Sequence, residues 1–373
     1  MTIKNKKLIV TIIYITLLIV LITYLPVNAE DKKEELNLND LKKFSDLRGT
    51  ILTWADKSLV DIDLRNKYDV LITATFDTLT IWPSKDKLPE NFNPDEFIIM
   101  GQNPGLNVRH LHEEGITGKN VKVAIIDQPL LLAHQEYKGK IEKYTCIDCE
   151  GVEPQMHGAA VASLLAGDKC GVAPGVSLYY WAVPSWKRDY SQYSEALEQI
   201  MDYNKDKAIP DKIRVVSVSI GFQVKFKNLD LWKKILEKAK ENGLIVIDCE
   251  GDIFGIGCPI YENINDPKNY DICYFAQEFK DKITKGTIYI PIDNRSTASC
   301  EGEKDYVFWA RGGLSWGTPY LTGIIALGYQ INSNLDEDTM YKYLTETGTS
   351  FNRGWIVNPE KFIKKIKSNS IKS

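Results

Sequence analysis

The sequence lacks the features that mark fibrous, disordered and multi-pass membrane proteins. Its 25 glycines and 15 prolines follow no short period, which excludes a collagen-like or fibrous chain. Hydrophobic residues make up 44% of the 373 residues and charged residues 26%, so wholesale disorder is excluded as well. Only one stretch is apolar for long enough to cross a bilayer, and this excludes a multi-pass membrane protein.

The sequence also has no excess of basic residues. Its formal net charge is −4, which argues against nucleic acid as the main partner. The length of the chain predicts either two domains or one large α/β domain with an extension.

The N-terminus is the one long apolar stretch. Lys4, Lys6 and Lys7 precede an apolar run over residues 8–25, and small residues ending at Ala29 follow it. A basic, then apolar, then small-residue order is typical of a secretory signal peptide. We therefore expect residues 1–29 to be a signal peptide cleaved after Ala29. The alternative is an uncleaved anchor, with residues 8–25 as the only membrane contact.

Both interpretations place the rest of the chain outside the cytoplasm, secreted or in the cell envelope. Cleavage would remove three lysines and leave 43 basic against 50 acidic residues, a net charge of −7. Such a surface favours solubility and is repelled by anionic lipid.

Cysteines are absent outside residues 146–300, and their number, seven, is odd. An exported chain permits disulfides, but at least one thiol must stay unpaired within the monomer. Cys146 and Cys149 form a Cys-x-x-Cys pair, which could be a redox pair or half of a zinc site. Because no second pair stands at ligand spacing, we expect structural or incidental cysteines and no metal site.

Residues 30–105 read as an N-terminal extension. Its first part is charged and polar, residues 70–76 predict a strand by their β-branched and aromatic content, and prolines break the stretch after residue 76 into loop. The turn at residues 103–105 suggests a boundary there.

From residue 106 onward, strands alternate with helices. Short apolar runs predict buried strands at 121–126, 177–183, 215–220 and 244–247. One predicted helix carries Tyr193, Leu197, Ile200 and Met201 on a single face, and another, with Leu231, Ile235 and Ala239, ends at Gly243. This alternation predicts an α/β fold, a doubly wound and mainly parallel sheet flanked by helices, over residues 106–373. In such sheets, ligands bind beyond the carboxyl ends of the strands.

Three polar residues stand where that rule expects function. Asp127 directly follows a predicted buried strand, and His157 opens a helix of small residues. Ser315 follows two glycines and precedes a buried helix containing Pro319. Free N–H groups at the start of that helix favour a developing anion. Each of these residues, taken alone, is more often structural than catalytic.

Together, the three residues fit nucleophilic catalysis. A serine hydroxyl is a weak nucleophile until a base takes its proton. The base needs a carboxylate that holds its tautomer and stabilises the imidazolium. The chain order Asp–His–Ser is that of subtilisin and differs from those of chymotrypsin and the α/β-hydrolases.

Four motifs in this order carry a resemblance to the subtilisin-like serine proteases, the subtilase family (peptidase S8). Residues 124–127 resemble the family's aspartate motif, and residues 134–137 resemble the segment that often follows it. Residues 157–162 resemble the histidine motif His-Gly-Thr-His-Val-Ala. Residues 171–174 match the family's Gly-Val-Ala-Pro, and residues 313–319 resemble Gly-Thr-Ser-Met-Ala-Thr-Pro.

The resemblance implies a serine endopeptidase with Asp127, His157 and Ser315 as its triad and a protein or peptide as its substrate. It also implies that substrate pairs as an added strand with the cleft segment, represented by Ser217, Ser219, Ile220 and Gly221. Calcium sites are common in the family, but no ligands can be placed here. Many members carry a removable N-terminal prosegment, and residues 30–105 resemble one by position only. The alternative is that they are a permanent part of the mature protein.

The sequence departs from the family where an asparagine usually completes the oxyanion hole. By count from Gly243, that position is Asp252. An ionised aspartate would repel the oxyanion, and loss of one such donor costs about 10²–10³ in rate, a figure established on subtilisin itself. We therefore expect slow turnover at neutral pH that improves in mild acid, where a protonated Asp252 could donate. Asn294 is a less favoured substitute donor. Leu314 and Trp316 stand where the family prefers Thr and Met, and we expect Trp316 to serve packing.

Two other functions compete with the endopeptidase. One is a non-catalytic or weakly active peptide-binding protein on a subtilase scaffold, which Asp252 favours. The other is a thiol-redox or metal-binding envelope protein that uses Cys146 and Cys149.

Overall fold

The structure is a computed structural model that describes residues 36–221, 225–251, 253–274 and 283–370. The predicted signal peptide or anchor and the predicted oxyanion residue Asp252 lie outside the described residues. In the described ranges, no helix combines the length and the apolar character needed to cross a membrane.

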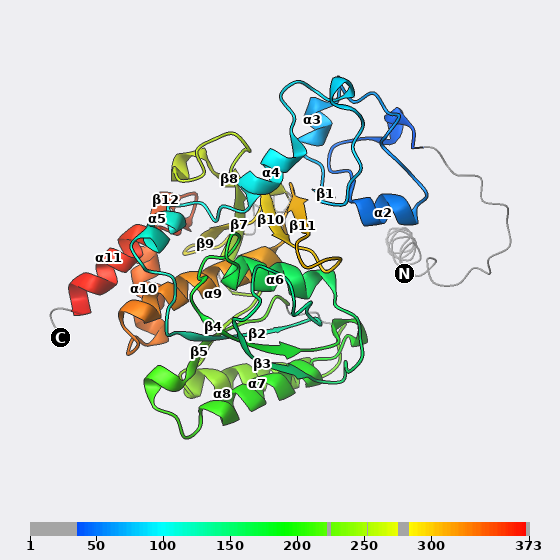
Figure 1. Cartoon of the computed structure of the whole chain (residues 1–373). Coiled ribbons are helices and arrows are strands. Elements are labelled where there is room, and N and C mark those ends of the chain that lie inside the picture. Colours follow the sequence, from blue (N-terminus) through cyan, green and yellow to red (C-terminus); the bar gives the residue numbers. More distant parts are fainter. Residues whose placement is uncertain (1–35, 222–224, 252, 275–282, 371–373) are drawn as a thin grey trace, which may run out of the picture. The chain divides into compact units, whose positions relative to one another are not determined.

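A five-stranded parallel sheet forms the centre of the fold (Figure 1). Its order is β3-β4-β2-β5-β6, and every neighbouring pair is parallel. The strands are β2 (Lys122–Asp127), β3 (Ile141–Cys146), β4 (Ser177–Ala182), β5 (Ile213–Ser217) and β6 (Ile245–Ile247). The chain crosses from β4 over β2 to β5, so the strand order reverses around β2. The predicted α/β sheet is confirmed.

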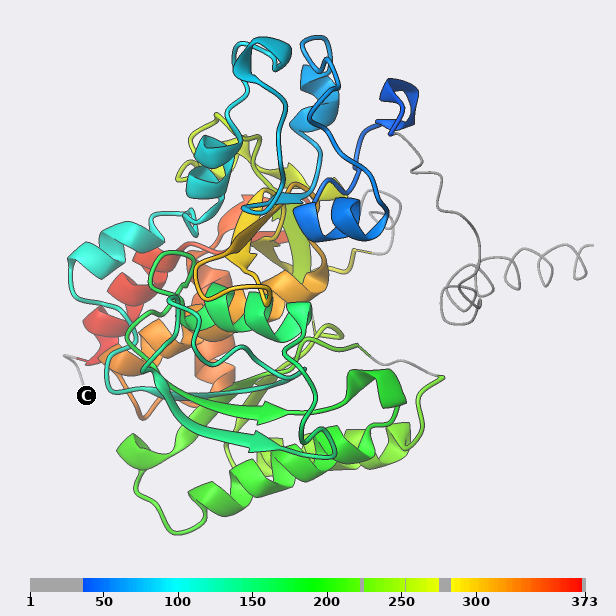
Figure 2. The same ribbon diagram turned by 45° about the vertical axis from the view of Figure 1, so that its right-hand side comes forward.

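Helices cover both faces of this sheet, as Figure 2 shows. Alternate residues of β2 enter two separate cores. Val123 and Ile125 pack in the core that α6 (Met156–Ala166) and α9 (Leu314–Ile331) help to form. Ala124 and Ile126 pack in the core of α7 (Ser191–Asn204) and α8 (Leu229–Glu241). Because both faces are buried, the strand reads as a continuous apolar run.

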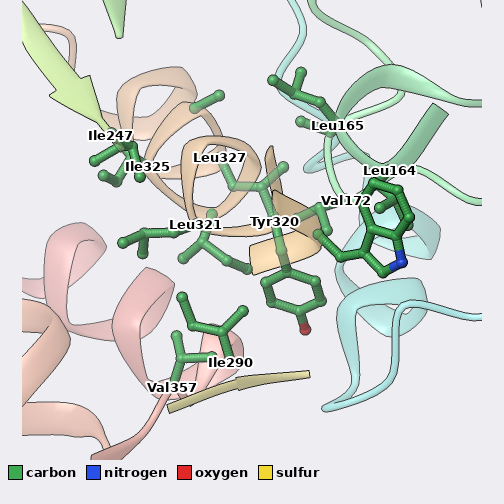
Figure 3. Close-up of a cluster of buried hydrophobic side chains, with 14 of the residues drawn as sticks. Leu164, Leu165, Val172, Ile247, Ile290, Tyr320, Leu321, Ile325, Leu327 and Val357 are labelled. Carbon is green, nitrogen blue, oxygen red and sulfur yellow. The ribbon is translucent and has the colours of Figure 1, made fainter. Parts of the chain in front are cut away.

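The first of these cores surrounds α9 (Figure 3). Leu321 and Ile325 of this helix are buried together with Leu164 and Leu165 of α6. A helix that is apolar on nearly every side must be enclosed by the protein. Its N-terminus is therefore fixed from several directions.

A second sheet has the order β12-β13-β9-β7-β8 and mixes parallel and antiparallel pairs. Its strands are β12 (Thr349–Phe351), β13 (Gly354–Ile356), β9 (Ile288–Pro291), β7 (Ile253–Gly257) and β8 (Asp271–Ile272). Helices α10 (Glu337–Thr347) and α11 (Pro359–Ser370) complete the C-terminal part.

A third sheet joins the N-terminal extension to the rest of the described chain. Strand β1 (Phe76–Asp77) pairs antiparallel with β11 (Tyr306–Trp309), which also pairs with β10 (Arg295–Ala298). The helices of this N-terminal region are α2 (Gly49–Trp54), α3 (Tyr68–Leu71) and α4 (Pro94–Gly101), and α5 (Val108–Glu113) follows it. The 3₁₀ helices of the described residues are η1 (Leu38–Asp40), η2 (Lys85–Lys87), η3 (Ser185–Lys187), η4 (Ile209–Asp211) and η5 (Pro267–Asn269).

Two local predictions are wrong. The strand expected at 70–76 is mostly absent, because Val70 and Leu71 end α3 and the Thr73 hydroxyl donates to the Val70 carbonyl at 2.9 Å, closing that turn. On α8, Leu231 is exposed and Trp232 takes the buried position beside Ile235 and Ala239. The indole buries more apolar surface than leucine does, so it sets the face of the helix.

Candidate active site

Asp127 and His157 meet at the carboxyl end of the central sheet. Asp127 is the last residue of β2 and is 4% exposed. Its Oδ1 accepts hydrogen bonds from the Gln128 amide at 2.8 Å and from His157 Nδ1 at 2.7 Å. This arrangement fixes the His157 tautomer, with its proton on Nδ1 and Nε2 free to accept one.

The position of His157 depends on its neighbour, Gly158. His157 is the second residue of α6, and a Cβ at Gly158 would lie 2.4 Å from the Gln128 carbonyl oxygen. Glycine therefore lets the start of α6 approach the end of β2, which brings His157 to Asp127. The other histidines serve elsewhere: His110 bonds Glu360, His112 bonds the Val172 carbonyl and His134 bonds the Asp305 carbonyl.

Ser315 is the second residue of α9 and lines the same cavity as Asp127 and His157. In the described structure, no hydrogen bond joins its Oγ to His157; the hydroxyl donates instead to the Ser219 carbonyl, at 3.4 Å. The Ser315 backbone N–H has no acceptor among the described residues, as expected at a helix N-terminus. This donor could face a developing anion.

The cavity has a volume of about 520 Å³. Of the predicted cleft residues, Ser219, Ile220 and Gly221 line it. Ser217 does not: it is 1% exposed at the end of β5, and its hydroxyl contacts Thr318 at 3.4 Å. The complete lining is Asp127, Gln128, His157, Ser185, Tyr193, Ser219, Ile220, Gly221, Phe226, Cys249, Glu250, Gly313, Leu314 and Ser315.

Asn294 does not lie in this cavity. It lines two other cavities, and its side-chain amide donates to the Cys258 carbonyl at 2.8 Å. The idea that Asn294 replaces the missing oxyanion donor is therefore wrong. Asp252, the position counted from the family pattern, lies outside the described residues.

Pro319 sits deeper in α9 than a helix start. Without a proline N–H, the carbonyl four residues earlier, that of Ser315, loses its usual helical partner. The Ser219 hydroxyl supplies the missing donor at 3.0 Å and also contacts the Thr318 hydroxyl at 2.5 Å. This connection ties the cleft segment to the helix that carries Ser315.

Two pKa shifts describe the electrostatics of the site. Burial lowers the pKa of His157, but the charge of Asp127 and its hydrogen bond raise it by more, so the net pKa lies above its usual value. Burial raises the pKa of Cys249 to about 12, while the Ser315 hydroxyl beside it acts in the opposite direction. Cys249 therefore remains a neutral thiol near pH 7.

Cys249 and Glu250 also line the cavity, although no motif of the sequence indicates them. Both closely follow the carboxyl end of β6, and Asp127 stands at the carboxyl end of β2. The rule that ligands bind beyond the carboxyl ends of parallel strands would have pointed to them.

The Cys146–Cys149 pair is apart from this cavity. All seven cysteines are described, and none forms a disulfide with another. Burial raises the pKa of Cys149 to about 12, with Cys146 beside it adding to the shift. Among the described residues, no group of three or more His, Cys, Asp or Glu side chains could hold a metal ion.

Comparisons with known proteins agree with one another. The family model "Peptidase_S8: Subtilase family" matches residues 118–352, well over half of the chain. The major intracellular serine protease of Bacillus subtilis is 24% identical over 260 residues, which are 63% of this chain and 75% of that protein. Subtilisin E of the same organism is 25% identical over 238 residues, 58% of this chain and 57% of that protein.

Solved structures show the same fold. A structure described as that of subtilase cytotoxin SubAB matches 74% of this chain and 97% of its own, with a TM-score of 0.54 and 15% identity. The A-subunit of the AB5 toxin from E. coli matches 73% of this chain and 98% of its own, with a TM-score of 0.52 and 15% identity. At such identity, the likeness bears on the fold alone, which is subtilisin-like.

Proposed function

The chain belongs to the subtilase family of serine proteases, and from this premise we propose that it is an endopeptidase that uses Asp127, His157 and Ser315. The observation that carries the proposal is the 2.7 Å bond between His157 Nδ1 and Asp127, both of which line a cavity that Ser315 also lines. These are the groups that nucleophilic serine catalysis needs.

In the proposed reaction, the Ser315 hydroxyl leaves the Ser219 carbonyl and turns to His157 Nε2. Such hydrogen bonds are often long or absent before substrate binds. His157 takes the proton as Ser315 Oγ attacks the peptide carbonyl carbon, and it then passes the proton to the leaving amine. Water hydrolyses the resulting acyl-enzyme by the same route. Asp127 holds the ring and stabilises the imidazolium.

The substrate backbone would lie along Ser219, Ile220 and Gly221 as an added strand. The Ser315 N–H, at the start of α9, would donate to the oxyanion.

Asp252 makes the pH dependence of this reaction unusual. We expect an ionised Asp252 to slow turnover at neutral pH, and its protonation in mild acid to reduce this deficit relative to Asp252→Asn. Protonation of His157 lowers the rate of both chains in the same range. Replacing Asp252 with Asn should then raise the rate at pH 7 by about 10²-fold. The rate of peptide hydrolysis across pH 5 to 8 measures this effect, and an unchanged or lower neutral rate in Asp252→Asn would contradict it.

Covalent labelling by a fluorophosphonate tests the proposal directly. The probe should label Ser315, and Ser315→Ala should abolish labelling. Ser58→Ala, which changes an exposed serine in the N-terminal region, is the matched control and should label as the wild type does. Absence of labelling in the wild type from pH 5 to 8 would overturn the proposal.

A second candidate function is peptide binding without turnover. The contact of the Ser315 hydroxyl with Ser219 instead of His157 favours it. This function predicts that peptides bind both the wild type and Ser315→Ala, while neither hydrolysis nor labelling occurs.

Export is a separate proposal that rests on residues 1–29 alone. N-terminal sequencing of the protein from the medium and from the membrane fraction would distinguish cleavage after Ala29 from an uncleaved anchor. Recovery of the protein in the cytoplasm would contradict both.

A further inference from the structure

The imidazole of His157 is contacted from two directions. Its Nδ1 edge bonds Asp127 at 2.7 Å. Its ring also packs against the indole of Trp316, with centroids 5.5 Å apart and planes inclined by 40°. Trp316 directly follows Ser315 on α9, so one turn of one helix carries both the hydroxyl and this ring.

The indole has little freedom to move away. Trp316 is 5% exposed, and its ring contacts Trp309 edge-on at 5.5 Å. The indole Cδ1 would lie 2.9 Å from a Cβ at Gly312, so glycine there leaves room for it. Trp316 does not line the cavity that His157 and Ser315 share, and it therefore supports the imidazole without occupying substrate space.

Packing alone does not explain a tryptophan at this position. Its Nε1 is buried and has no hydrogen-bond partner within the described part of the chain. A buried donor without an acceptor destabilises a fold. Phenylalanine or leucine would avoid that penalty, but each is smaller and would leave a cavity. Beyond its volume, tryptophan differs from both in the strength of its electron-rich face.

We propose that Trp316 is a positioning residue for the reaction proposed above, holding the His157 ring in place and stabilising its imidazolium form. A cation within about 6 Å of an aromatic centroid is attracted to the ring face, and tryptophan provides the strongest attraction. The imidazolium forms when His157 accepts the proton of Ser315, so this attraction grows as the reaction proceeds. The catalytic role of Trp316 rests on the proposed function, whereas its effect on the pKa of His157 can be measured without any turnover.

Other groups also face His157 or its cavity. Asp127 contacts the ring from β2, and Ser315 lies nearby on α9. Cys249 and Glu250 line the cavity from the segment after β6. None of these groups is changed by a substitution at Trp316. Loss of the attraction to the indole lowers the pKa of His157, whereas any gain in exposure of the ring raises it, so a lowered pKa reports the attraction.

The first experiment measures the pKa of His157 by NMR titration of its ring protons. The full chain carries Ser315→Ala, so the measurement needs no turnover, and the signal is assigned by loss in His157→Gln. We expect Trp316→Leu to lower the pKa by about half a unit and Trp316→Phe to give an intermediate value. Trp82→Leu, which removes a ring whose described ring contacts are with Phe76 and Phe92 and not with Trp316 or His157, should leave the pKa unchanged.

The second experiment measures fluorophosphonate labelling of Ser315 against pH in chains that retain the serine. The acid limb of the labelling rate, where the rate falls as His157 takes a proton, should move to lower pH in Trp316→Leu by the same amount as the NMR pKa. In Trp316→Phe, the acid limb should move in the same direction by a smaller amount. Thermal unfolding checks that each variant is folded, and we expect Trp316→Phe to lose less stability than Trp316→Leu because it leaves the smaller cavity and, like Leu, removes the unpaired N–H.

The result that overturns the inference is an equal pKa of His157 in the wild type and Trp316→Leu, or equal values in the Phe and Leu variants. Failure of the wild type to label at all would overturn the proposed function, and the NMR comparison would still decide the role of Trp316.

Discussion

Asp127 acts on His157 through both its charge and its hydrogen bond, so replacing it with Asn should change two observables. The amide favours the wrong imidazole tautomer, and we expect the labelling rate of Ser315 to fall by about 10³–10⁴-fold. The lost charge should also lower the pKa of His157, which Asp127 now raises. Because the base works in its neutral form, the acid limb of the pH–rate profile should move to lower pH.

The control for this substitution is Asp211→Asn, which removes an exposed carboxylate that pairs with Lys122 at 2.8 Å. It should leave both the rate and the acid limb unchanged. An unshifted acid limb in Asp127→Asn would contradict the assignment of the raised pKa to this carboxylate.

Asp293 connects the loop before Ser315 to the second sheet, and its titration should affect stability. Its Oδ1 accepts from the Gly312 amide and its Oδ2 from the Tyr274 amide, both at 2.8 Å. Burial raises its pKa to about 6, with these hydrogen bonds acting in the opposite direction. In the unfolded chain, an aspartate titrates near pH 4. Between about pH 4 and 6, the folded state therefore holds a proton that the unfolded state has lost.

Because the folded state binds more protons than the unfolded state in this window, the free energy of unfolding should fall as pH rises from 4 to 6. It should level off above pH 6. Relative to Asp293→Asn, the wild type should lose up to about 2–3 kcal/mol between pH 4 and 6. Urea unfolding at several pH values measures this difference. The control Asp336→Asn should show no change in that window, because bonding to Thr339 holds the pKa of Asp336 below its usual value. A wild-type stability that rises from pH 4 to 6 relative to Asp293→Asn would contradict the prediction.

At the scale of helices and strands, the sequence predicts best where one rule decides the outcome. The face of α7 formed by Tyr193, Leu197, Ile200 and Met201 is buried as its 3.6-residue period indicates. For α8, the 3.6-residue period does not decide whether Leu231 or Trp232 is buried with Ile235 and Ala239. Only packing in the folded protein selects Trp232. The cavity contains the predicted Asp127, His157 and Ser315 because strand and helix ends converge by a general rule of parallel sheets.

The bond between Ser219 and the Ser315 carbonyl shows what an element-scale prediction cannot include. A proline inside a helix leaves a carbonyl free, and that much can be read from the sequence. Which side chain compensates depends on a residue 96 positions away that the fold brings to α9. No local pattern contains that information.

The close approach of α6 to β2 can be tested by adding one methyl group. In Gly158→Ala, the new Cβ would lie 2.4 Å from the Gln128 carbonyl oxygen and 2.7 Å from the Tyr180 hydroxyl. The start of α6 must then shift, at a cost of about 1–3 kcal/mol, and His157 moves with it. A displacement of about 1 Å can reduce a rate by about 10²-fold, so we expect a comparable loss in the labelling rate of Ser315.

The matched control is Ala162→Gly, which destabilises the same helix by about 1 kcal/mol without a steric clash. It should unfold at a lower temperature yet label at close to the wild-type rate. Equal labelling losses in both variants would mean that helix stability, and not the position of His157, determines the rate.

At the scale of the whole chain, the N-terminal extension shares a core with residues more than 200 positions away. Phe76 pairs with Phe308 across β1 and β11. Both rings are buried in one cluster with Phe97, Tyr306 and Cys170. The sequence identifies the apolar residues of this region but not their distant partners, because neither periodicity nor spacing encodes which surfaces meet.

Buried hydrogen bonds cross the same boundary. The Ser296 hydroxyl donates to the Ile98 carbonyl at 2.8 Å, and Arg295 Nε donates to the Gly101 carbonyl at 3.3 Å. The Arg295 guanidinium is buried, and its Nη2 donates to the Cys170 carbonyl at 3.0 Å. Loss of residues 36–105 would remove an acceptor from this cation and uncover Phe308.

We therefore predict that residues 36–105 stay in the mature protein and are not a prosegment. Each fully buried Phe or Leu stabilises a fold by about 1.5–3 kcal/mol, and total stabilities are only about 5–15 kcal/mol. Removing the cover of this shared core should abolish cooperative unfolding, measured by calorimetry on a chain that starts at residue 106. Intact-mass measurement should find residues 36–105 in both the purified wild type and Ser315→Ala. Self-processing of a prosegment would give the opposite pattern: a wild type that begins near residue 106 and labels faster, beside a Ser315→Ala chain that keeps the extension.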